Sequence, residues 1–248
     1  MITVNDLHKR YGDQTVLDGV NFTIQRGTVT TIIGRSGGGK SVLLRHLMGL
    51  ETPDSGEVII DGENLSRMGD ADLNRIRRRF GILFQEGALF DSLTVAENVA
   101  FPLEEHTKLS QSEIMDVVRE KLATVGMTGH EDKYPAQISG GMRKRTALAR
   151  ALALDPDIVF FDEPTTGLDP VTKSAIYALI KTTHEQTSTT YVIVSHDIRG
   201  VFPVSDETMM LWDGRILARG TPEEMERYPD PVVQQFISGS PEGPIHVD

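Results

Sequence analysis

The residues best suited to chemistry stand together at positions 34–41, which read Gly-Arg-Ser-Gly-Gly-Gly-Lys-Ser. Glycines let the backbone curl so that several N–H groups point inward, and a following helix presents its positive end to the same place. In this pattern Lys40 is a point charge for outer phosphates, and the Ser41 hydroxyl is an oxygen ligand for Mg²⁺. A flexible glycine-rich turn has the same composition. However, the segment follows a strand-like run and opens a helix-like one, which favours a phosphate-binding loop. Its candidate contact residues are Gly34, Arg35, Ser36, Gly37, Gly38, Gly39, Lys40 and Ser41.

Two adjacent carboxylates close the apolar run Ile-Val-Phe-Phe-Asp-Glu at residues 158–163. A run without polar alternation is typical of a strand buried on both faces, and open α/β sheets bind ligands at the carboxyl ends of such strands. Asp162 is therefore a candidate for the Mg²⁺ shell. Glu163 is a candidate for the general base that polarises the attacking water. A lone Asp-Glu pair is often only a solvated strand end, so this prediction depends on the phosphate loop.

Two more polar side chains follow apolar runs of the same kind. His196 comes after Tyr-Val-Ile-Val-Ser, and Gln85 comes after Phe-Gly-Ile-Leu-Phe. We predict that His196 hydrogen-bonds the γ-phosphate or the attacking water, and that the Gln85 amide reaches Mg²⁺ or water when the site closes. Ser195, His196 and Asp197 are a nucleophilic triad in letters only, because triad members come from separate elements and strand neighbours point opposite ways.

A second helix start suited to anions stands at Ser139, Gly140 and Gly141. Ser139 is a good N-cap, and the two glycines expose backbone N–H groups before a helix-like run over residues 143–154. One chain hardly needs two such ends for one nucleotide. An economical arrangement gives this end to the γ-phosphate bound by another copy, so we predict a homodimer with two ATP molecules between head-to-tail chains. An ordinary capped helix is the alternative.

The elements that must position these residues alternate between apolar runs and helix-like stretches, which predicts an α/β fold with a largely parallel sheet. Buried strands are expected over residues 28–33, 80–84, 158–161 and 191–194. Short antiparallel strands are expected over residues 2–7, 16–24 and 57–60, and Asp213-Gly214 predicts a hairpin between 209–212 and 215–218. Helices are expected over residues 40–50 and 110–125 and from Thr221 onward, and residues 88–153 are interpreted as a helical subdomain inserted into the core.

The composition excludes several classes of protein. A net charge of −11 argues against a nucleic-acid partner, and the absence of cysteine excludes disulfides, thiolate metal sites and a Cys nucleophile. No apolar run approaches the roughly 20 residues that span a bilayer, and the first residues lack the pattern of a signal peptide. We therefore expect a cytoplasmic chain that reaches a membrane only through partners. The basic clusters at 75–79 and 143–145 are interpreted as solvated helix faces.

Taken together, the motifs resemble those of an ABC ATPase over residues 1–225. The resemblance implies the P-loop NTPase ABC ATPase fold, with a mixed sheet core, an antiparallel β subdomain and an inserted helical subdomain over about residues 88–153. Motifs in the order and spacing of the family are the phosphate loop, Gln85, Ser139-Gly140-Gly141, Asp162-Glu163, Asp169 within Gly-Leu-Asp-Pro, and His196.

The resemblance also implies roles for individual residues, with ATP and Mg²⁺ as the bound groups. It adds Tyr11 as the aromatic that stacks on adenine and places Asp169 in a contact across the dimer. The implied catalytic residues are Lys40, Glu163 and His196, and the implied metal-shell residues are Ser41, Gln85 and Asp162. The chain departs from the family at Met142, where Gln is usual, and at Val42, a nucleotide-contacting position where Thr is usual. Met142 cannot supply an amide hydrogen bond, so contacts there must rely on Ser139 and the backbone.

Several segments resemble more specifically the ATPases of bacterial Mla (maintenance of lipid asymmetry) phospholipid systems. These segments are residues 34–50, 84–90, 98–103 and 138–145. The likeness implies phospholipid transport between the inner and outer membranes, powered at the cytoplasmic face of the inner membrane. The implied partners are an integral-membrane permease dimer, a small STAS-domain subunit and a periplasmic lipid-binding MCE protein. A close relative would serve steroids or other apolar solutes through similar lipid-binding proteins.

Three points stay open at this level. The apolar residues Leu89, Phe90, Leu93, Phe101 and Leu103 either line a groove for a short permease helix or pack as core. The C-terminal extension, residues 226–248, either docks on a partner subunit or is flexible. A non-transport ABC ATPase is disfavoured, because the sequence shows neither a coiled-coil insertion nor a second cassette. A binding module that has lost its ATPase activity is disfavoured by the intact motif residues.

Overall fold

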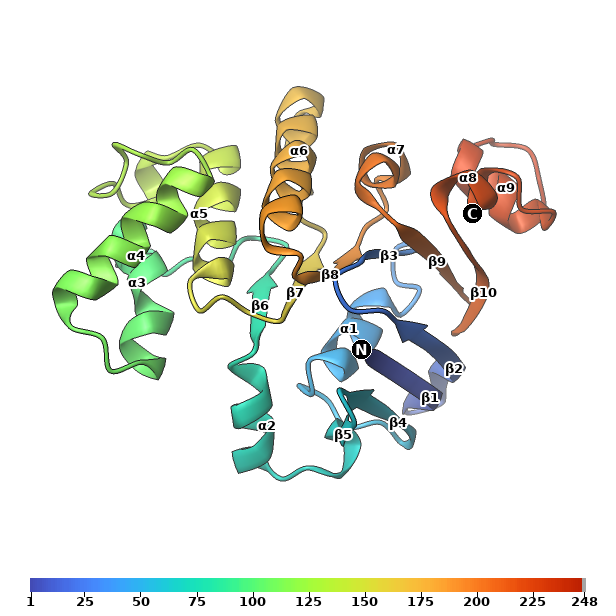
Figure 1. Ribbon diagram of the computed structural model, residues 1–248. Coiled ribbons are helices and arrows are strands. Elements are labelled where there is room, and N and C mark those ends of the chain that lie inside the picture. Colours follow the sequence, from blue (N-terminus) through green and yellow to red (C-terminus); the bar gives the residue numbers. More distant parts are fainter. Residues whose placement is uncertain (247–248) are drawn as a thin grey trace. The chain divides into compact units, whose positions relative to one another are not determined.

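The structure is a computed structural model, and it describes residues 1–246 of the chain. The chain forms two compact units, Met1–Leu73 with Val192–Asp248, called the terminal unit, and Asn74–Tyr191, called the middle unit. Figure 1 labels the helices and strands. The boundaries fall inside helix α2 (Asp70–Arg77) and inside strand β8 (Thr190–Val194). Each unit has its own core and its own share of the predicted site residues.

The terminal unit contains a four-stranded antiparallel sheet in the order β2-β1-β4-β5. Its strands are β1 (Ile2–Tyr11), β2 (Gln14–Ile24), β4 (Ser55–Ile60) and β5 (Glu63–Asn64), and a 3₁₀ turn, η1 (Leu65–Arg67), follows. Strand β1 alternates at its start, burying Ile2 and Val4. We expected this strand to end near residue 7, but it continues because β2 pairs with it as far as Tyr11. Tyr11 therefore stands at the end of a strand.

The same unit carries the buried strand β3 (Val29–Ile33), which runs parallel to β9 (Glu207–Trp212). Strand β9 turns into β10 (Arg215–Gly220) through Asp213 at φ 45° and Gly214 at φ 77°. Two consecutive left-handed residues make the tight turn that the Asp-Gly pair predicts. The helices are α1 (Lys40–Leu47), α7 (Ile198–Val201), α8 (Pro222–Glu226) and α9 (Pro231–Ser238), with a 3₁₀ turn, η3 (Phe202–Val204).

Two predicted helix boundaries in the terminal unit can be compared with the structure. Helix α1 ends three residues before the predicted end at residue 50, since Gly49 at φ 63° takes the left-handed conformation that terminates helices. The helix expected from Thr221 is confirmed: its hydroxyl caps the N–H of Glu224, whose carboxylate reaches back to the N–H of Thr221. Beyond α9, buried Gln235 hydrogen-bonds the backbone of Ser240 and Ile245. Part of the C-terminal extension is thus tied to its own chain, and residues 247 and 248 lie outside the described residues.

The middle unit is built on β6 (Phe80–Leu83) and β7 (Ile158–Asp162), which pair in parallel with Phe80 opposite Ile158. The strand order continues from β7 to β8. Strand β7 is buried from Ile158 to Phe161. Its aromatic side chains form the core contacts, with ring centroids 5.3 Å apart for Phe80 and Phe160 and 5.1 Å apart for Phe161 and Tyr191. The fully apolar runs thus mark strands covered on both faces.

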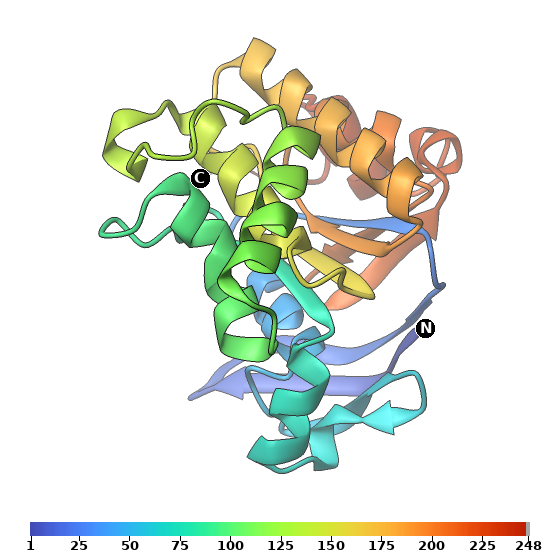
Figure 2. The same cartoon turned by 60° about the vertical axis from the view of Figure 1, so that its left-hand side comes forward.

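Four longer helices complete the middle unit: α3 (Val95–His106), α4 (Gln111–Thr124), α5 (Gly140–Leu152) and α6 (Pro170–Thr187), with a 3₁₀ turn, η2 (Pro135–Gln137). Helices α3, α4 and α5 pack against one another (Figure 2). Thr94 and Ser110 begin α3 and α4 with capping boxes that use Glu97 and Glu113. Within the described residues, no helix has the length and apolar character needed to cross a membrane.

Candidate functional site

Residues 34–41 join β3 to α1, and glycine is required at both ends of this loop. Gly34 has φ 153°, and a Cβ on it would lie 2.3 Å from the backbone oxygen of Leu211. Gly39 precedes α1 at φ 93°, and its Cβ would lie 3.0 Å from Val16. A larger residue would clash at Gly34 and would be strained at Gly39, so the loop has the curled backbone that a phosphate cradle needs.

Lys40, the first residue of α1, fills the centre of this loop. Its side chain is buried, and Nζ donates hydrogen bonds to the carbonyl oxygens of Gly34 at 2.8 Å and Arg35 at 2.9 Å. The first helical bond, from the N–H of Leu43 to the oxygen of Gly39, is 2.8 Å long. A buried ammonium at a helix N-terminus favours a polyanion. Among the other predicted contact residues of the loop, Ser36, Gly37 and Ser41 are exposed, while Gly38 and Val42 are half-buried.

Arg35, also predicted to contact phosphate, lies over an aromatic ring of the hairpin. Its guanidinium carbon is 5.7 Å from the centroid of Trp212, and Nη2 is 3.9 Å from an oxygen of Asp213. The Trp212 ring also meets Phe236 of α9 edge-on at 5.9 Å. The loop is therefore linked through one arginine to the β9–β10 hairpin and to the C-terminal helix.

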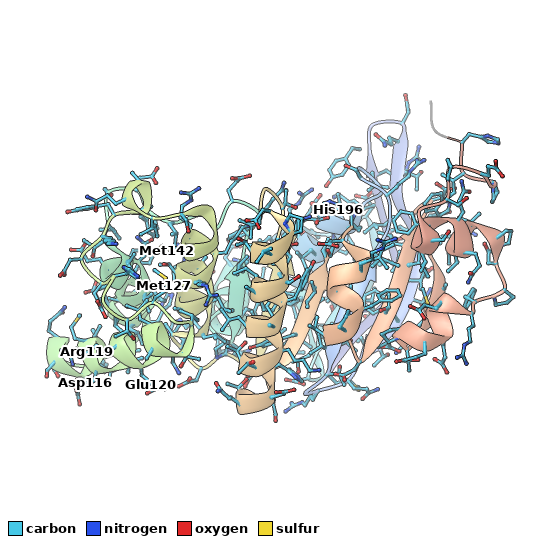
Figure 3. The ribbon with its side chains drawn as sticks, turned by 90° about the horizontal axis from the view of Figure 1, so that it is seen from above. Asp116, Arg119, Glu120, Met127, Met142 and His196 are labelled. Carbon is cyan, nitrogen blue, oxygen red and sulfur yellow. The ribbon has the colours of Figure 1, made fainter. Side chains whose placement is uncertain are left out.

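Tyr11, the predicted adenine platform, lies exposed at the end of β1 in the same unit. His196, the predicted γ-phosphate ligand, follows β8 and is also exposed (Figure 3). Its neighbours Ser195 and Asp197 both accept hydrogen bonds from backbone N–H groups. Ser195 is buried with its N–H donating to Ile32, and Asp197 caps α7 by accepting from the N–H of Gly200 at 3.3 Å.

The two predicted carboxylates stand at the end of β7, in the middle unit. Asp162 is the last residue of the strand, and Glu163 follows it at φ 51°. A left-handed conformation is costly for a residue with a Cβ and is often found at functional sites. Thr166 donates to Glu163 Oε2 at 3.4 Å through its hydroxyl, and its N–H bonds to the Glu163 carbonyl. The turn therefore fixes the backbone that carries the Glu163 carboxylate.

Gln85 follows β6 and is exposed, while its carbonyl accepts a hydrogen bond from Lys144 Nζ. Lys144 is only 5% exposed, so the prediction of a solvated basic face over residues 143–145 is wrong at this position and holds for exposed Arg143. Burial lowers the pKa of the Lys144 ammonium, while the carboxylates of Glu86 and Glu163 oppose that shift. Lys144 thus links α5 to the Gln85 carbonyl, and the carboxylates of Glu86 and Glu163 stabilise its ammonium charge.

Sequence reasoning missed Lys144, although a signal for its burial exists. It lies three residues after Gly141 and four before Leu148, both of which are buried on the inner face of α5. Residues at these spacings share one side of a helix. Helical periodicity therefore places Lys144 inward, whereas the neighbouring charges suggested a solvated face.

Ser139 begins α5 as predicted. Its Oγ accepts the N–H of Met142 at 3.2 Å, and the helix starts at Gly140 rather than at residue 143. Met142 lies in the first turn (Figure 3) and adds no polar group there. The exposed Ser139 and half-buried Gly140 leave this helix start open to an anion, while Gly141 is buried. The contact with a second copy's nucleotide stays a prediction.

Asp169 also begins a helix. Its carboxylate accepts the N–H groups of Val171 at 3.0 Å and Thr172 at 3.1 Å, and it accepts the Thr172 hydroxyl as well. These hydrogen bonds, led by the one from the Thr172 side chain, lower the pKa of the Asp169 carboxyl. Within its own chain Asp169 is thus the N-cap of α6, and its predicted contact across a dimer remains untested.

Comparison with known proteins decides the family. The family model described as "ABC transporter" matches residues 17–166. The chain belongs to the ABC transporter family. This cassette shares its fold with the solved dimer of the ATP-binding cassette MJ0796 bound to ADP and Pi, with a TM-score of 0.82 and 33% identity over 90% of this chain and 99% of that one. The predicted fold is therefore confirmed, and an ABC cassette binds and hydrolyses ATP.

Two groups of relatives resemble the cassette over nearly its whole length. The intermembrane phospholipid transport system ATP-binding protein MlaF of Haemophilus influenzae is 40% identical over 99% of this chain and 93% of that protein. The probable ribonucleotide transport ATP-binding protein mkl of Mycobacterium tuberculosis is 46% identical over 98% of this chain and 68% of that protein. The predicted family is thus confirmed, whereas the two relatives are named for different cargoes.

Proposed function

We propose that this chain is the ATP-hydrolysing subunit of a bacterial ABC transporter that moves phospholipid between the inner and outer membranes. The phosphate loop carries the hydrolytic part of the proposal, because buried Lys40 and two obligatory glycines prepare it for a polyphosphate. The 40% identity to MlaF over 99% of the chain supports the lipid cargo. The chain acts at the cytoplasmic face of the inner membrane and touches the membrane only through partners.

The proposal assigns roles in ATP binding and hydrolysis to residues of both units. From the terminal unit, Lys40 and the loop N–H groups bind the β- and γ-phosphates, Tyr11 stacks on adenine, and His196 hydrogen-bonds the γ-phosphate. From the middle unit, Glu163 accepts the proton of the attacking water, whose oxygen bonds to the γ-phosphorus as the bond to the bridging oxygen breaks. ADP and phosphate leave, and the proton passes from Glu163 to solvent or to phosphate.

The proposed Mg²⁺ shell uses Ser41, Asp162 and Gln85, which offer the hydroxyl, carboxylate and amide oxygens that this ion prefers. Among the described residues, no group of three or more His, Cys, Asp or Glu side chains gathers as a metal cage. An ion held largely by phosphates and waters needs only one or two carboxylates, so this donor set fits. Mg²⁺ bound there would neutralise charge on the outer phosphates.

A homodimer completes the proposed site. The start of α5 offers exposed Ser139 and half-buried Gly140, and its backbone N–H groups are suited to the γ-phosphate held by the other copy. Asp169 lies at the start of α6, where the proposal places a contact across the dimer. The related cassette MJ0796 is described as dimeric with ADP and Pi bound, which supports this arrangement.

A permease helix is the proposed occupant of an apolar groove in the middle unit. The groove encloses about 310 Å³ and is lined by Phe80, Gly81, Ile82, Phe84, Ala88, Phe90, Phe101, Pro102, Arg150, Ala151 and Leu154. Phe90 and Phe101 lie with ring centroids 4.8 Å apart and remain exposed, whereas Leu103 is buried core. Arg150 secures the groove by donating to the carbonyl oxygens of Ala88 and Gly87. Phe90 and Phe101 thus line the groove, whereas Leu103 belongs to the core.

The specific partners follow from the lipid proposal. They are an integral-membrane permease dimer, a small STAS-domain subunit and a periplasmic lipid-binding MCE protein. A second candidate is the same motor serving another cargo. The 46% identity to mkl, which is named for probable ribonucleotide transport, supports this second candidate. Its possible cargoes also include steroids and other apolar solutes.

The test is purification of the tagged chain with its permease from native membranes, followed by mass spectrometry of the bound small molecules and a phosphate-release assay. We expect phospholipid on the complex and ATP turnover that depends on Lys40. A Phe101→Asp variant should lose the permease while still binding ATP. Bound ribonucleotide or steroid in place of phospholipid would refute the lipid proposal and leave the motor intact. No ATP turnover by the complex would refute both.

A further inference from the structure

The hydroxyl group of Tyr11 is held by a ring of charged side chains within the terminal unit. Tyr11 Oη donates to Glu51 Oε1 and accepts a hydrogen bond from Arg45 Nη2 at 3.3 Å. Arg45 Nε donates to Glu51 Oε2 at 3.1 Å, which closes the ring. A tyrosine side chain has only two torsions, so anchoring its far end fixes the whole phenol ring in place.

Lys9 covers the same phenol ring from its side. Its Nζ lies 5.5 Å from the ring centroid, within the range of a cation–π contact. The ammonium is itself held by the carbonyl oxygen of Thr52 at 2.9 Å and by Glu51 Oε1 at 3.3 Å. Tyr11 nevertheless remains 42% exposed. Part of the ring is therefore left accessible, and a planar ligand can stack on it.

These side chains also connect the ring to the phosphate loop. Arg45 lies on α1, five residues after Lys40, and Glu51 follows the end of that helix. Five residues of α-helix span about 7.5 Å and form a rigid spacer. The position of the Tyr11 ring is thus set by the same helix whose first residue is Lys40.

The charge state of Glu51 suits a permanent anchor. Burial alone would raise the pKa of its carboxyl, but the hydrogen bonds from Tyr11, Arg45 and Lys9 outweigh burial and bring this pKa down to about 2. The carboxylate accordingly stays ionised at any working pH and accepts all three bonds at once.

We propose that Glu51 is a positioning residue, which with Arg45 and Lys9 holds Tyr11 as a preformed platform for the base of a nucleoside triphosphate. The inference rests on the proposed function, in which Tyr11 stacks on adenine. A platform that is ordered before binding lowers the entropy lost when the base stacks on it. Glu51 touches neither base nor phosphate in this arrangement and acts only through Tyr11.

The test compares two probes on the full chain by calorimetry, ATP and inorganic tripolyphosphate. The second probe has the phosphates without the base. Tyr11→Ala should weaken ATP binding about tenfold or more, the range expected for loss of one stacked base. Tyr11→Phe keeps the ring but frees it, and Glu51→Leu removes the anchor, so each should weaken ATP binding about three- to fivefold. Glu51→Gln should recover part of that loss, and all four variants should bind tripolyphosphate within about twofold of wild type.

Glu57→Gln is the matched control, because Glu57 is also a hydrogen-bonded surface glutamate of this unit but contacts Asn5, Asn64 and Arg67 instead. It should leave the affinity for both probes unchanged. A double variant, Tyr11→Phe with Glu51→Leu, should be no weaker for ATP than either single variant, because both changes remove the same restraint.

Three results would overturn the positioning role. Unchanged ATP affinity in Tyr11→Phe and Glu51→Leu, with a loss in Tyr11→Ala, would refute the anchor while leaving the stacking role intact. Equal losses for ATP and tripolyphosphate in Glu51→Leu would show that Glu51 acts on the phosphate loop instead. Unchanged ATP affinity in Tyr11→Ala would remove the stacking role on which the inference rests. Should Glu51→Leu fail to fold, Tyr11→Phe still tests the anchor, and unchanged ATP affinity in that variant would refute the positioning role.

Discussion

The ionised Glu51 carboxylate should give this protein a stability term that disappears in acid. Its pKa lies at about 2 in the folded chain, well below the ordinary value of 4.5 for a glutamate carboxyl. A carboxyl whose pKa is depressed by folding contributes stability above its unfolded pKa and loses it as pH falls through the folded value. The relevant window therefore runs from about pH 5 down to about pH 2.

The size of this term follows from the shift. The lowered pKa corresponds to at most about 3 kcal/mol, of which about 1 kcal/mol is lost between pH 7 and pH 3.5. Glu51 keeps 18% of its side-chain surface exposed, so solvent screens the interaction. We therefore expect a loss of less than about 1 kcal/mol by pH 3.5.

The measurement is urea unfolding of the wild type and of Glu51→Gln at pH 7, 5, 4 and 3.5. Glutamine has nearly the same shape but does not titrate, so the gap in unfolding free energy between the two proteins should narrow as pH falls. Tyr11→Phe removes one of the three hydrogen bonds to Glu51. The gap in unfolding free energy between Tyr11→Phe and Glu51→Gln should therefore narrow by less than the gap between wild type and Glu51→Gln. A gap that stays constant over the whole range would show that the network does not depress this pKa, and the reasoning would fail.

Three further predictions concern the proposed ATP site. Glu163→Gln should bind ATP but release phosphate at least about a hundredfold more slowly, and it should accumulate as a closed dimer in size-exclusion chromatography with ATP. Lys144→Met should keep the unfolding free energy within about 1 kcal/mol, because an apolar side chain replaces a desolvated charge, yet slow phosphate release by loosening Gln85. Gly34→Ala should lower the unfolding free energy by about 1–3 kcal/mol and abolish ATP binding, because its Cβ would meet the Leu211 carbonyl.

Each of these predictions can fail in a distinct way. Phosphate release near the wild-type rate in Glu163→Gln would remove the general-base assignment. A large loss of stability in Lys144→Met would show that the Lys144–Gln85 bond supports the fold rather than the site. Wild-type ATP affinity in Gly34→Ala would mean that the loop can relax away from strand β9, contrary to the close approach seen here.

The parts of the fold that sequence predicted are those determined by residues close together in the chain. The turn at Asp213-Gly214, the N-cap at Ser139 and the capping box at Thr221 all form as local patterns indicate. The same holds for the phosphate loop, whose chemistry is contained in eight consecutive residues. In each case the interaction closes within a few residues, so no knowledge of the tertiary structure is needed.

Features that bring distant residues together were not predicted. Tyr11 meets Glu51 across 40 residues, and Lys144 reaches the Gln85 carbonyl across 59. Nothing in either local sequence specifies such a partner. The apolar residues after Gln85 show the same limit, because packing alone decides that Leu103 is buried while Phe90 and Phe101 stay exposed.

The backbone at Glu163 has a consequence for any attempt to make this protein more heat-resistant. A side chain with a Cβ in the left-handed region costs about 1 kcal/mol that glycine would avoid. Selection for thermal tolerance alone would therefore enrich replacements at this position, and in the proposed mechanism every such replacement removes the base. A library screened only by melting temperature should accumulate inactive chains, whereas one screened for turnover should retain the glutamate despite its cost.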